Sequence, residues 1–445
     1  MTTITDAGPH FAPGFTRQAV ETLSHAKGEP EWMLEKRLAA FAAYEATPLP
    51  TRDQRAWKYT DVSRLNLDAF APHARPPQDV AARAPVLLPD EMTAAGVLQQ
   101  FDSHAHGGDL FEAAQRQGVV FTSIDHAVKE HPDLLRRYFM TECVPAGRDK
   151  FTALHGAFWS GGVFVYVPKN VEVRLPLYNL LWAESEAIAV FPHALIVAEP
   201  NSQVTLVEEY GSAEVQQGIL SCGVTEIIAH EGARVRYVNL QRWGSTATHF
   251  GMQRALLDRS ASLNFATIGL GGRLAKATGE SVMRGEGASS ELLGLFFGRR
   301  GQQFDYVTLQ DHQAPHTSSD LLFKSALTDR ARSIYYGLVR VGPQAAASDA
   351  NQENRNLLLS DRAKADSDPV LEILTSEVTR CTHGASVGPV DEEELFYLQS
   401  RGITRTEAEK LLVSGFFNQV IGRVPDESVQ QRLHDAVDER VLLLA

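Results

Sequence analysis

The chain has 445 residues, of which 44% are hydrophobic and 22% charged, so it can bury a sizeable core and is not a disordered protein. Its net charge of −13 argues against proteins that neutralise nucleic-acid phosphates or bind anionic membrane surfaces. It has no apolar run of membrane-spanning length, no basic and apolar leader, and only three scattered cysteines, Cys143, Cys222 and Cys381. We therefore expect a soluble, cytoplasmic protein of about three domains.

The first 150 residues predict a mostly helical N-terminal domain. A helix begins near Glu31, with apolar residues at helical spacing, and ends before Pro48. A second helix is expected over 125–139. The Pro- and Ala-rich stretch at 71–77 is typical of a linker.

Residues 151–386 predict a β-rich domain built from a repeat. A strand at 161–167 ends at Pro168, and an apolar run, a tight polar turn and alternating apolar positions then recur. The repeat positions 203, 233, 261, 288, 331 and 363 are separated by 30, 28, 27, 43 and 32 residues. This period favours a solenoid of stacked strand coils over a β-sandwich, and we attribute the step of 43 to an inserted loop.

The last segment, 387–445, predicts a C-terminal helical domain. Asp391 with Glu394, and Thr404 with Glu407, have the spacing of capping boxes, and Gly402 suits the end of the helix between them. A further helix is expected after Pro425. Its apolar stripe is formed by four residues, Val429, Leu433, Val437 and Val441.

Common catalytic motifs are missing from the sequence. The stretch at 271–278 has the wrong spacing for a phosphate-binding loop, and the glycines at 269–271 do not complete a dinucleotide-binding loop. Neither a Gly-x-Ser-x-Gly elbow nor a His-Glu-x-x-His zinc helix occurs. We therefore expect that the chain does not hydrolyse ATP.

One constellation points to metal chemistry. Cys381 and His383 are two residues apart in an extended segment, so their side chains share one face. Sulfur and imidazole nitrogen suit iron, zinc or an iron–sulfur cluster. Two donors do not complete a four-ligand site, so another subunit would have to supply the rest. The alternatives are that Cys381 is an inert buried thiol and His383 a structural histidine.

The other candidate ligands favour structural interpretations. His104 and His106 are expected in a solvated loop, and His312 and His316 in a polar turn. Cys143 lacks a partner motif, Cys222 is expected in the core, and the acidic run at 391–394 is typical of a helix start.

The sequence resembles the SufB/SufD family of the SUF iron–sulfur cluster assembly system over nearly its whole length. Within that family it is most similar to SufD-type members, because HGA at 383–385 replaces the His-Glu-Ala usual in SufB and further SufB cysteines are absent. The runs that carry the resemblance are WKYTD at 57–61, AFWSGG at 157–162, YVPK at 166–169, SDANQ at 348–352, NLLLS at 356–360, PVLEI at 369–373, CTHGASVG at 381–388 and LFYLQSRGI at 395–403.

The resemblance implies a right-handed parallel β-helix flanked by helical domains. It also implies a non-catalytic scaffold that pairs with SufB through the β-helix and with the ATPase SufC through its C-terminal helices. A nascent iron–sulfur cluster would form transiently at the SufB–SufD interface, with none held stably by the isolated chain. By position, His383 would face that interface with Cys381 beside it. The residues expected to dock the ATPase are Phe396, Tyr397, Arg401, Gly402, Leu411 and Phe416.

Two alternatives belong to other classes of protein. In the first, a homodimer of this chain binds a mononuclear metal such as zinc at Cys381 and His383. In the second, the β-helix is a carbohydrate-active enzyme, but the carboxylate clusters and basic groove that such lyases use are not visible in the sequence.

Overall fold

The structure is a computed structural model that describes residues 11–74, 94–110 and 112–442. The start of the chain and part of the predicted linker at 71–77 lie outside these ranges. No helix among the described residues is long and apolar enough to span a membrane.

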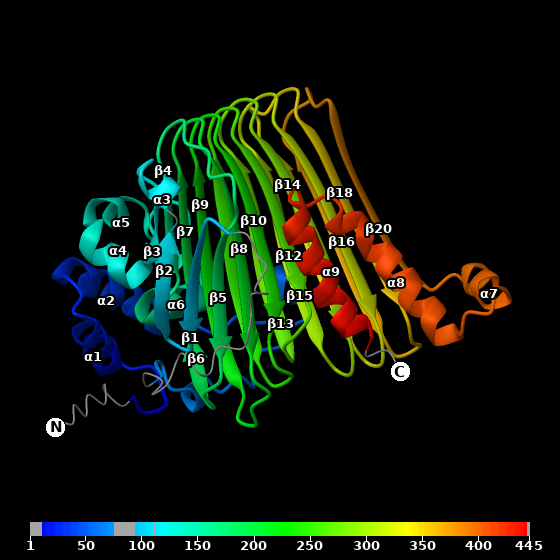
Figure 1. Cartoon of the computed structure of the whole chain (residues 1–445), viewed down its shortest axis with the longest axis horizontal. Coiled ribbons are helices and arrows are strands. Elements are labelled where there is room, and N and C mark those ends of the chain that lie inside the picture. The colour runs from blue at the N-terminus through cyan, green and yellow to red at the C-terminus, as the bar shows by residue number, and fades with distance from the viewer. Residues whose placement is uncertain (1–10, 75–93, 111, 443–445) are drawn as a thin grey trace.

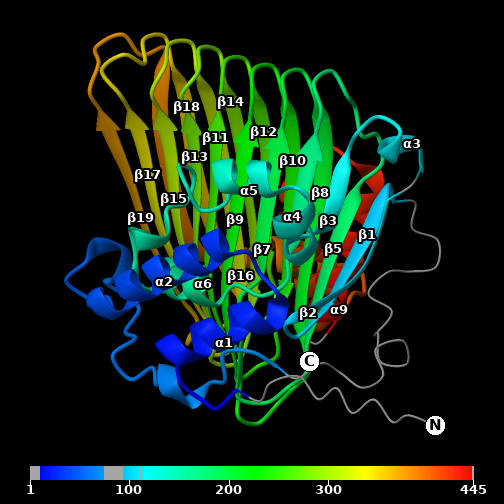
Figure 2. The ribbon, with the colours of Figure 1, turned by 90° about the vertical axis from the view of Figure 1, so that its left-hand side faces the viewer.

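The centre of the molecule is a β-solenoid of about eight coils, with two sheets of stacked strands facing one another (Figure 1, Figure 2). The β20 sheet contains, in order, β2(His104–Leu110), β1(Gly96–Phe101), β5(Leu177–Ala183), β8(Gln203–Ser212), β10(Arg234–Arg242), β12(Ser262–Gly269), β14(Ser289–Gly298), β16(Ser318–Leu327), β18(Asp349–Leu358) and β20(Arg380–Pro389). The β19 sheet contains β19(Lys364–Ile373), β17(Arg332–Val341), β15(Gln303–His312), β13(Leu274–Met283), β11(Thr248–Leu257), β9(Ile219–Ala229), β7(His193–Ala198), β4(Val163–Val167) and β3(Val120–Ser123), with β6(Ile188–Val190) beside β9.

The predicted β-solenoid is confirmed, but the explanation of its longest step is wrong. The step of 43 residues runs from the start of β14, in the β20 sheet, to the start of β17, in the β19 sheet. These two strands lie one and a half coils apart along the chain, so the step is longer than one coil. The coil between them is of ordinary length, since β16 follows β14 in the β20 sheet after 29 residues. No inserted loop is present there. The motif recurs in both sheets because each coil makes the same kind of turn twice.

Aromatic rings stack inside the solenoid, where alternate residues of each strand point inward. Phe296 lies over Tyr306 with the ring centroids 3.9 Å apart, and Phe323 follows at 5.6 Å from Phe296 and 5.4 Å from Tyr335. All four rings are buried. Parallel in-register pairing repeats each inward position from coil to coil, so the interior forms continuous columns of side chains.

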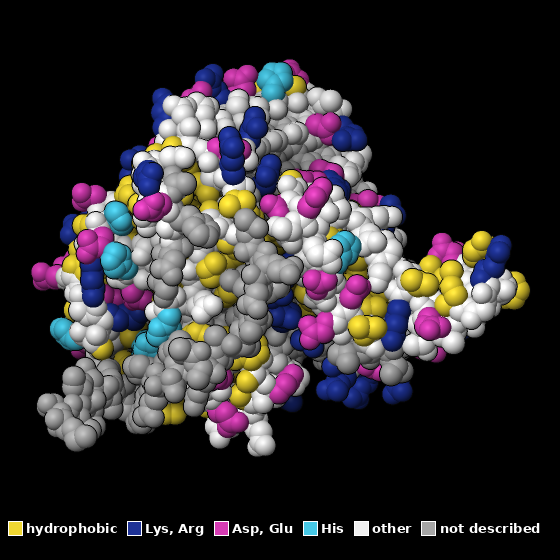
Figure 3. Space-filling model, viewed as in Figure 1, with side chains coloured by type: hydrophobic (Ala, Val, Ile, Leu, Met, Phe, Trp, Pro, Cys, Tyr) yellow, Lys and Arg dark blue, Asp and Glu magenta, His cyan; other side chains and the backbone are white. Residues whose placement is uncertain are grey.

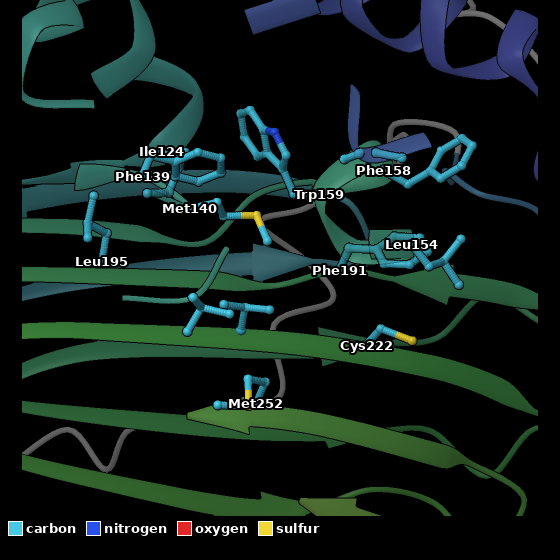
Figure 4. Close-up of a cluster of buried hydrophobic side chains, with 14 of the residues drawn as sticks. Ile124, Phe139, Met140, Leu154, Phe158, Trp159, Phe191, Leu195, Cys222 and Met252 are labelled. Atoms are coloured by element: carbon cyan, nitrogen blue, oxygen red, sulfur yellow. The ribbon is translucent and has the colours of Figure 1, made fainter. Parts of the chain in front are cut away.

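N-terminal helices cover the outer face of the β19 sheet (Figure 2). Their shared apolar layer includes Phe139, Trp159, Phe191 and Cys222 (Figure 4). These helices are α1(Arg17–Lys27), α2(Glu31–Ala46), α4(Ile124–Glu130), α5(Pro132–Tyr138) and α6(Lys150–Phe158), with short 3-10 turns at Arg55–Trp57, Leu67–Ala69 and Ala146–Arg148. Helix α3(Glu112–Gln115) lies apart from them at the N-terminal end, where Ala114 packs against the solenoid interior (Figure 2).

The N-terminal region is less helical than its sequence indicates. The strands β1, β2 and β3 lie within it and extend both sheets of the solenoid. His104 and His106 therefore stand on β2, where His104 Nε2 lies 3.0 Å from the carbonyl oxygen of Ala74, and the expectation of a solvated loop was wrong. Pairing of β1 with β5 and with β2 creates β1 and β2, which have little β propensity of their own.

A buried cation joins the N-terminal helices to one another. The Arg37 guanidinium is fully buried and pairs with both carboxylate oxygens of Glu29 at 2.7 Å. It also donates to the carbonyl oxygens of Ala157 and Trp159 at 3.0 Å and lies over the Trp159 ring. A buried charge is tolerated only when its partners satisfy it in this way.

The C-terminal helices lie on the outer face of the β20 sheet (Figure 1). Those on the sheet are α8(Arg405–Ile421) and α9(Glu427–Val441), while α7(Glu392–Ser400) projects beyond it. The predicted capping box of Thr404 and Glu407 is confirmed, whereas Asp391 accepts from the N–H of Glu393 at 2.8 Å instead of pairing with Glu394. All four residues of the predicted α9 stripe are buried. Arg423 fixes the α8–α9 turn by pairing with Glu291 and Asp320.

The Arg37 site gives a stability prediction. Replacing Arg37 with Ala leaves the buried Glu29 carboxylate and two carbonyl groups without their donor, so the free energy of unfolding should fall by about 3–5 kcal/mol. Arg17→Ala removes an exposed ion pair with Glu21 from the neighbouring helix and should change stability by less than about 1 kcal/mol. Urea unfolding of both variants measures the difference, and equal effects would contradict the role given to Arg37.

Candidate functional site

The two ends of the solenoid are finished differently. At the N-terminal end, β2 and β3 pair antiparallel with β1 and β4, and helices lie alongside. At the other end, β20 pairs with β18 and β19 with β17, and among the described residues no strand pairs with their free edges. Unpaired edge strands present free N–H and C=O groups that favour addition of another chain. The last coil, β19 with β20, is therefore the candidate site.

Both predicted ligands point to the interior side of this last coil. Cys381 is in register with Ala350 and His383 with Gln352, and Ala350 and Gln352 are fully buried in the preceding coil. Because side chains alternate between the two faces of a strand, the thiol and the imidazole also point toward the interior, at the open end that a further coil would cover. The two side chains therefore share one face of β20.

The two side chains differ in their surroundings. Cys381 is half-buried against an apolar cluster that includes Val339 and Val341. Burial raises the pKa of the Cys381 thiol, so it is protonated near neutral pH and must lose its proton before it binds a metal. His383 is exposed. Within the described ranges no group of three or more His, Cys, Asp or Glu side chains could hold a metal ion, so no other described residue completes a ligand set with Cys381 and His383.

The strand β19 adds a part of the surface that sequence reasoning missed. Ser367, Pro369 and Leu371 are in register with Tyr335, Gly337 and Val339, so they also face the open end. All three are only half-buried, whereas Tyr335 and Val339 beneath them are buried. Aligning the repeat separately for each sheet would have revealed these positions.

Polar side-chain contacts between β18 and β20 hold β20 in place on its outer face. Arg380 Nε pairs with Asp349 Oδ1 at 2.8 Å, and Thr382 donates to Asn351 Oδ1 at 2.8 Å. These contacts continue outward-facing positions from β18 to β20. The last strand is therefore fixed from outside, and its interior-facing side chains are left available.

A second exposed surface lies on the C-terminal helices. Phe396 and Tyr397 of α7 are 73% and 58% exposed, and Leu411 of α8 is 53% exposed. Leu395 and Ala408 form the buried contact between the two helices. Helix α7 projects beyond the last coil, and hydrophobic side chains gather on this projection (Figure 1, Figure 3).

The other residues named for docking have different surroundings. The Arg401 guanidinium lies 5.3 Å from the centre of the Tyr397 ring. Gly402 has a φ of +89°, which disfavours a side chain even though open space surrounds it. Phe416 is partly buried against the solenoid, where Lys324 donates to its carbonyl oxygen at 3.0 Å and lies over its ring. Phe416 thus serves mainly the internal contact.

The remaining candidate ligands lie away from the last coil. Cys143 and Cys222 are buried under the N-terminal helices, and burial raises the pKa of both thiols. His312 is buried at the end of β15, where its ring nitrogens lie 2.8 Å from the hydroxyls of Thr317 and Ser319.

Comparison with known proteins agrees with this architecture. Residues 181–416 match the family described as SUF system FeS cluster assembly, SufBD core domain, and residues 91–178 match the SufBD protein N-terminal region. An iron–sulfur cluster assembly SufBD family protein of Staphylococcus saprophyticus is 32% identical over 429 residues, covering 93% of this chain and 90% of the relative. A protein of the same description from Staphylococcus aureus has the same identity and coverage. The chain belongs to the SufBD family. The resemblance to this family is therefore confirmed.

In this SufBD-family chain, a buried carboxyl group that the sequence did not reveal links the helices to the solenoid. Glu226 on β9 accepts from the backbone N–H groups of Met140 and Val144 at 2.7 and 2.9 Å. Glu226 Oε2 also lies 3.2 Å from His193 Nε2. Burial raises the pKa of Glu226 to about 8 and lowers that of His193 to about 3, so both are neutral near pH 7.

The hydrogen-bond chain is consistent with this neutral state. His155 Nδ1 must donate to the carbonyl oxygen of Cys222 at 2.8 Å, so its Nε2 accepts from His193 Nδ1 at 2.9 Å. His193 Nε2 then carries a lone pair toward Glu226, which suits a protonated carboxyl group. An isolated glutamate in the strand sequence gives no sign of this, because the helices that bury it are distant in the sequence.

The Glu226 carboxyl gives a pH prediction. Its pKa is near 4.5 when unfolded and about 8 when folded, so its stabilising contribution is present below 4.5 and is lost as the pH rises toward 8. Between pH 5.5 and 7.5 the free energy of unfolding of the wild type should therefore fall by about 1.4 kcal/mol per pH unit relative to Glu226→Gln. Urea unfolding across this range measures it. Glu142→Gln, at an exposed carboxylate of the same segment, should run parallel to the wild type.

Proposed function

We propose that this chain is a SufD-type scaffold subunit of a cytoplasmic iron–sulfur cluster assembly complex, and that it has no catalytic activity of its own. The observation that carries the proposal is the uncovered last coil with Cys381 and His383 on its interior-facing side. Membership of the SufBD family supports it, because the matching family is one of iron–sulfur cluster assembly.

In this proposal a SufB-type paralogue covers the last coil. The free edges of β19 and β20 supply backbone donors and acceptors, and Leu371 and Val387 supply apolar contact. A second β-solenoid has the strand spacing to continue both sheets at once, which satisfies the edge groups and buries the apolar side chains. The paired ends then enclose His383 and Cys381.

The iron and sulfide of a nascent cluster are the cargo of this interface. His383 supplies a nitrogen donor, and Cys381 supplies a sulfur donor once its thiol loses its proton. The paralogue provides the remaining donors, since the described residues of this chain hold no complete set. Shared donation makes the cluster transient on this chain, because separating the ends removes part of the ligand set.

The projecting α7 surface is proposed to bind an ABC-type ATPase of the SufC kind. Phe396 and Tyr397 are large and exposed on a helix that packs only on its other side, which is typical of interface anchors. Arg401 lies beside Tyr397, and Gly402 and Leu411 are the other proposed members of this surface. The lack of a phosphate-binding loop in this chain fits ATP hydrolysis by a partner.

A homodimer with a mononuclear metal is the second candidate function. The same open end favours it, because a second copy would bring another Cys381 and another His383, which completes the four donors of a structural zinc site. Metal analysis of the purified chain separates the two functions. We expect less than about one tenth of an equivalent of zinc or iron per chain in the absence of a SufB-type partner.

Removing the imidazole tests the cluster site. His383→Ala should leave folding and complex formation intact, because the side chain is exposed and makes no internal hydrogen bond among the described residues. Cluster yield in anaerobic reconstitution of the purified complex should fall by roughly tenfold, as expected for loss of a metal-site residue. The yield is measured from the visible absorbance of the cluster.

A neighbouring variant controls for damage to the strand. Ser386→Ala changes an exposed side chain on the outer face of β20 and should keep the wild-type yield. An unchanged yield in His383→Ala, or an equal loss in both variants, would remove His383 from the mechanism.

Removing the exposed aromatic pair tests the ATPase surface. The double variant F396A/Y397A should weaken binding of the ABC-type ATPase by at least about tenfold, because buried aromatic anchors dominate interface energies. Titration calorimetry with the ATPase of the same organism measures the affinity. Leu175→Ala, which trims an exposed apolar residue of the solenoid, should bind like the wild type, and unchanged binding by F396A/Y397A would place the ATPase elsewhere.

A further inference from the structure

A hollow at one rim of the solenoid is lined by arginine side chains. Four successive coils send loops from the β20 sheet to the β19 sheet at this rim, and they contribute Glu214, Ser245, Arg273 and Arg299–Gln302. Arg440 of α9 closes one side. The hollow has a volume of about 290 Å³. Lys and Arg side chains gather below α9 in the view of Figure 3.

The charge of this hollow opposes that of the whole chain. Four arginines, Arg273, Arg299, Arg300 and Arg440, and one carboxylate, Glu214, line it, which gives a formal charge of +3 in a chain of net charge −13. Ser245 donates hydrogen bonds from its N–H and its hydroxyl to one oxygen of that carboxylate, at 2.9 and 2.6 Å. Concentrated positive charge in a concave surface attracts anions.

The four guanidinium groups have few partners in the protein, and Arg273 donates to the Thr248 hydroxyl at 3.2 Å. Within the described residues, none of them forms an ion pair with a carboxylate, and Arg440 Nε is buried without a hydrogen-bond partner. By contrast, the neighbouring Arg242 is paired with Glu209 and Glu439. A buried N–H without a partner costs free energy, so an acceptor from a ligand would stabilise this arrangement.

Hydrogen bonds between successive loops also fix the shape of the rim. Gln302 donates to the carbonyl oxygen of Gly272 at 2.9 Å, and the N–H of Gly272 bonds to the carbonyl oxygen of Trp243 at 2.9 Å. The N–H of Arg300 bonds to Asp329 at 2.8 Å. These bonds fix successive loops to one another, so the arginine backbones are positioned before any ligand arrives.

We propose that this hollow binds a small phosphate-bearing anion. Guanidinium groups match phosphate oxygens in paired, charge-assisted hydrogen bonds, and several arginines around one point suit a multiply charged phosphate. The volume admits a pyrophosphate or a small phosphate ester but not a helix or strand of a protein partner. The site lies away from Cys381, His383 and the α7 surface, so it is independent of the proposed cluster assembly.

Titration calorimetry of the full chain in 150 mM NaCl tests the site, with inorganic pyrophosphate and with ADP as probes. We expect pyrophosphate to bind with a Kd below about 1 mM, and the double variant R299Q/R300Q to bind at least about tenfold more weakly. The variant R116Q/R174Q removes two exposed arginine charges elsewhere and should change the Kd by less than about twofold. Equal affinities for the two probes assign the site to the phosphate groups alone, and tighter ADP binding assigns it to a nucleotide.

Three results would overturn the proposal. The first is no binding of either probe up to 10 mM, on the order of the weakest specific affinities. The second is an equal loss in R116Q/R174Q, which would reveal only a general effect of charge. The third is tighter binding of a polyglutamate peptide that is also sensitive to R299Q/R300Q, which would assign the arginines to an acidic protein segment. Unfolding temperatures of all variants without ligand verify that each is folded.

Discussion

In-register pairing between successive coils is the constraint on which the rest of this structure depends. A coil satisfies the backbone groups of its strands only through the coils on either side, so a stack of coils always has two ends with unpaired edges. In this chain the N-terminal end finishes with the antiparallel strands β2 and β3, and Ala114 of α3 packs against the solenoid interior. The C-terminal end has no such closure among the described residues, and the two candidate metal donors stand there.

The helical regions are attached to the solenoid by buried or half-buried charges as well as by apolar layers. Glu226 performs this role on the β19 sheet. On the β20 sheet, Arg423 bridges two carboxylates, and Arg432 pairs with Glu209. Each contact requires specific geometry, since an unmatched buried charge is costly. The helices are therefore held in a defined register on the sheets, which fixes where α7 emerges.

The sequence was most informative where one pattern repeats. Small residues and turns at regular spacing predicted the solenoid. The Thr404–Glu407 capping box predicted a helix start and the α9 stripe predicted a buried helix face, because both features depend on residues that are close together in the sequence. The strands β1 and β2 were missed, since the GVLQQF and HAHGGDL sequences become strands only by pairing with β5 and with each other. Likewise, whether Phe396 or Phe416 is exposed depends on which side of each helix meets another element, and the apolar pattern alone did not determine it.

The link between the last strand and the projecting helix is very short. β20 ends at Pro389 and α7 begins at Glu392, while Val390 between them is buried against Leu395. So short a connection cannot lengthen when α7 is displaced. A load applied to α7 is consequently transmitted to the free edge of the stack, so a body that grips the helix also acts mechanically on the strand that bears Cys381 and His383.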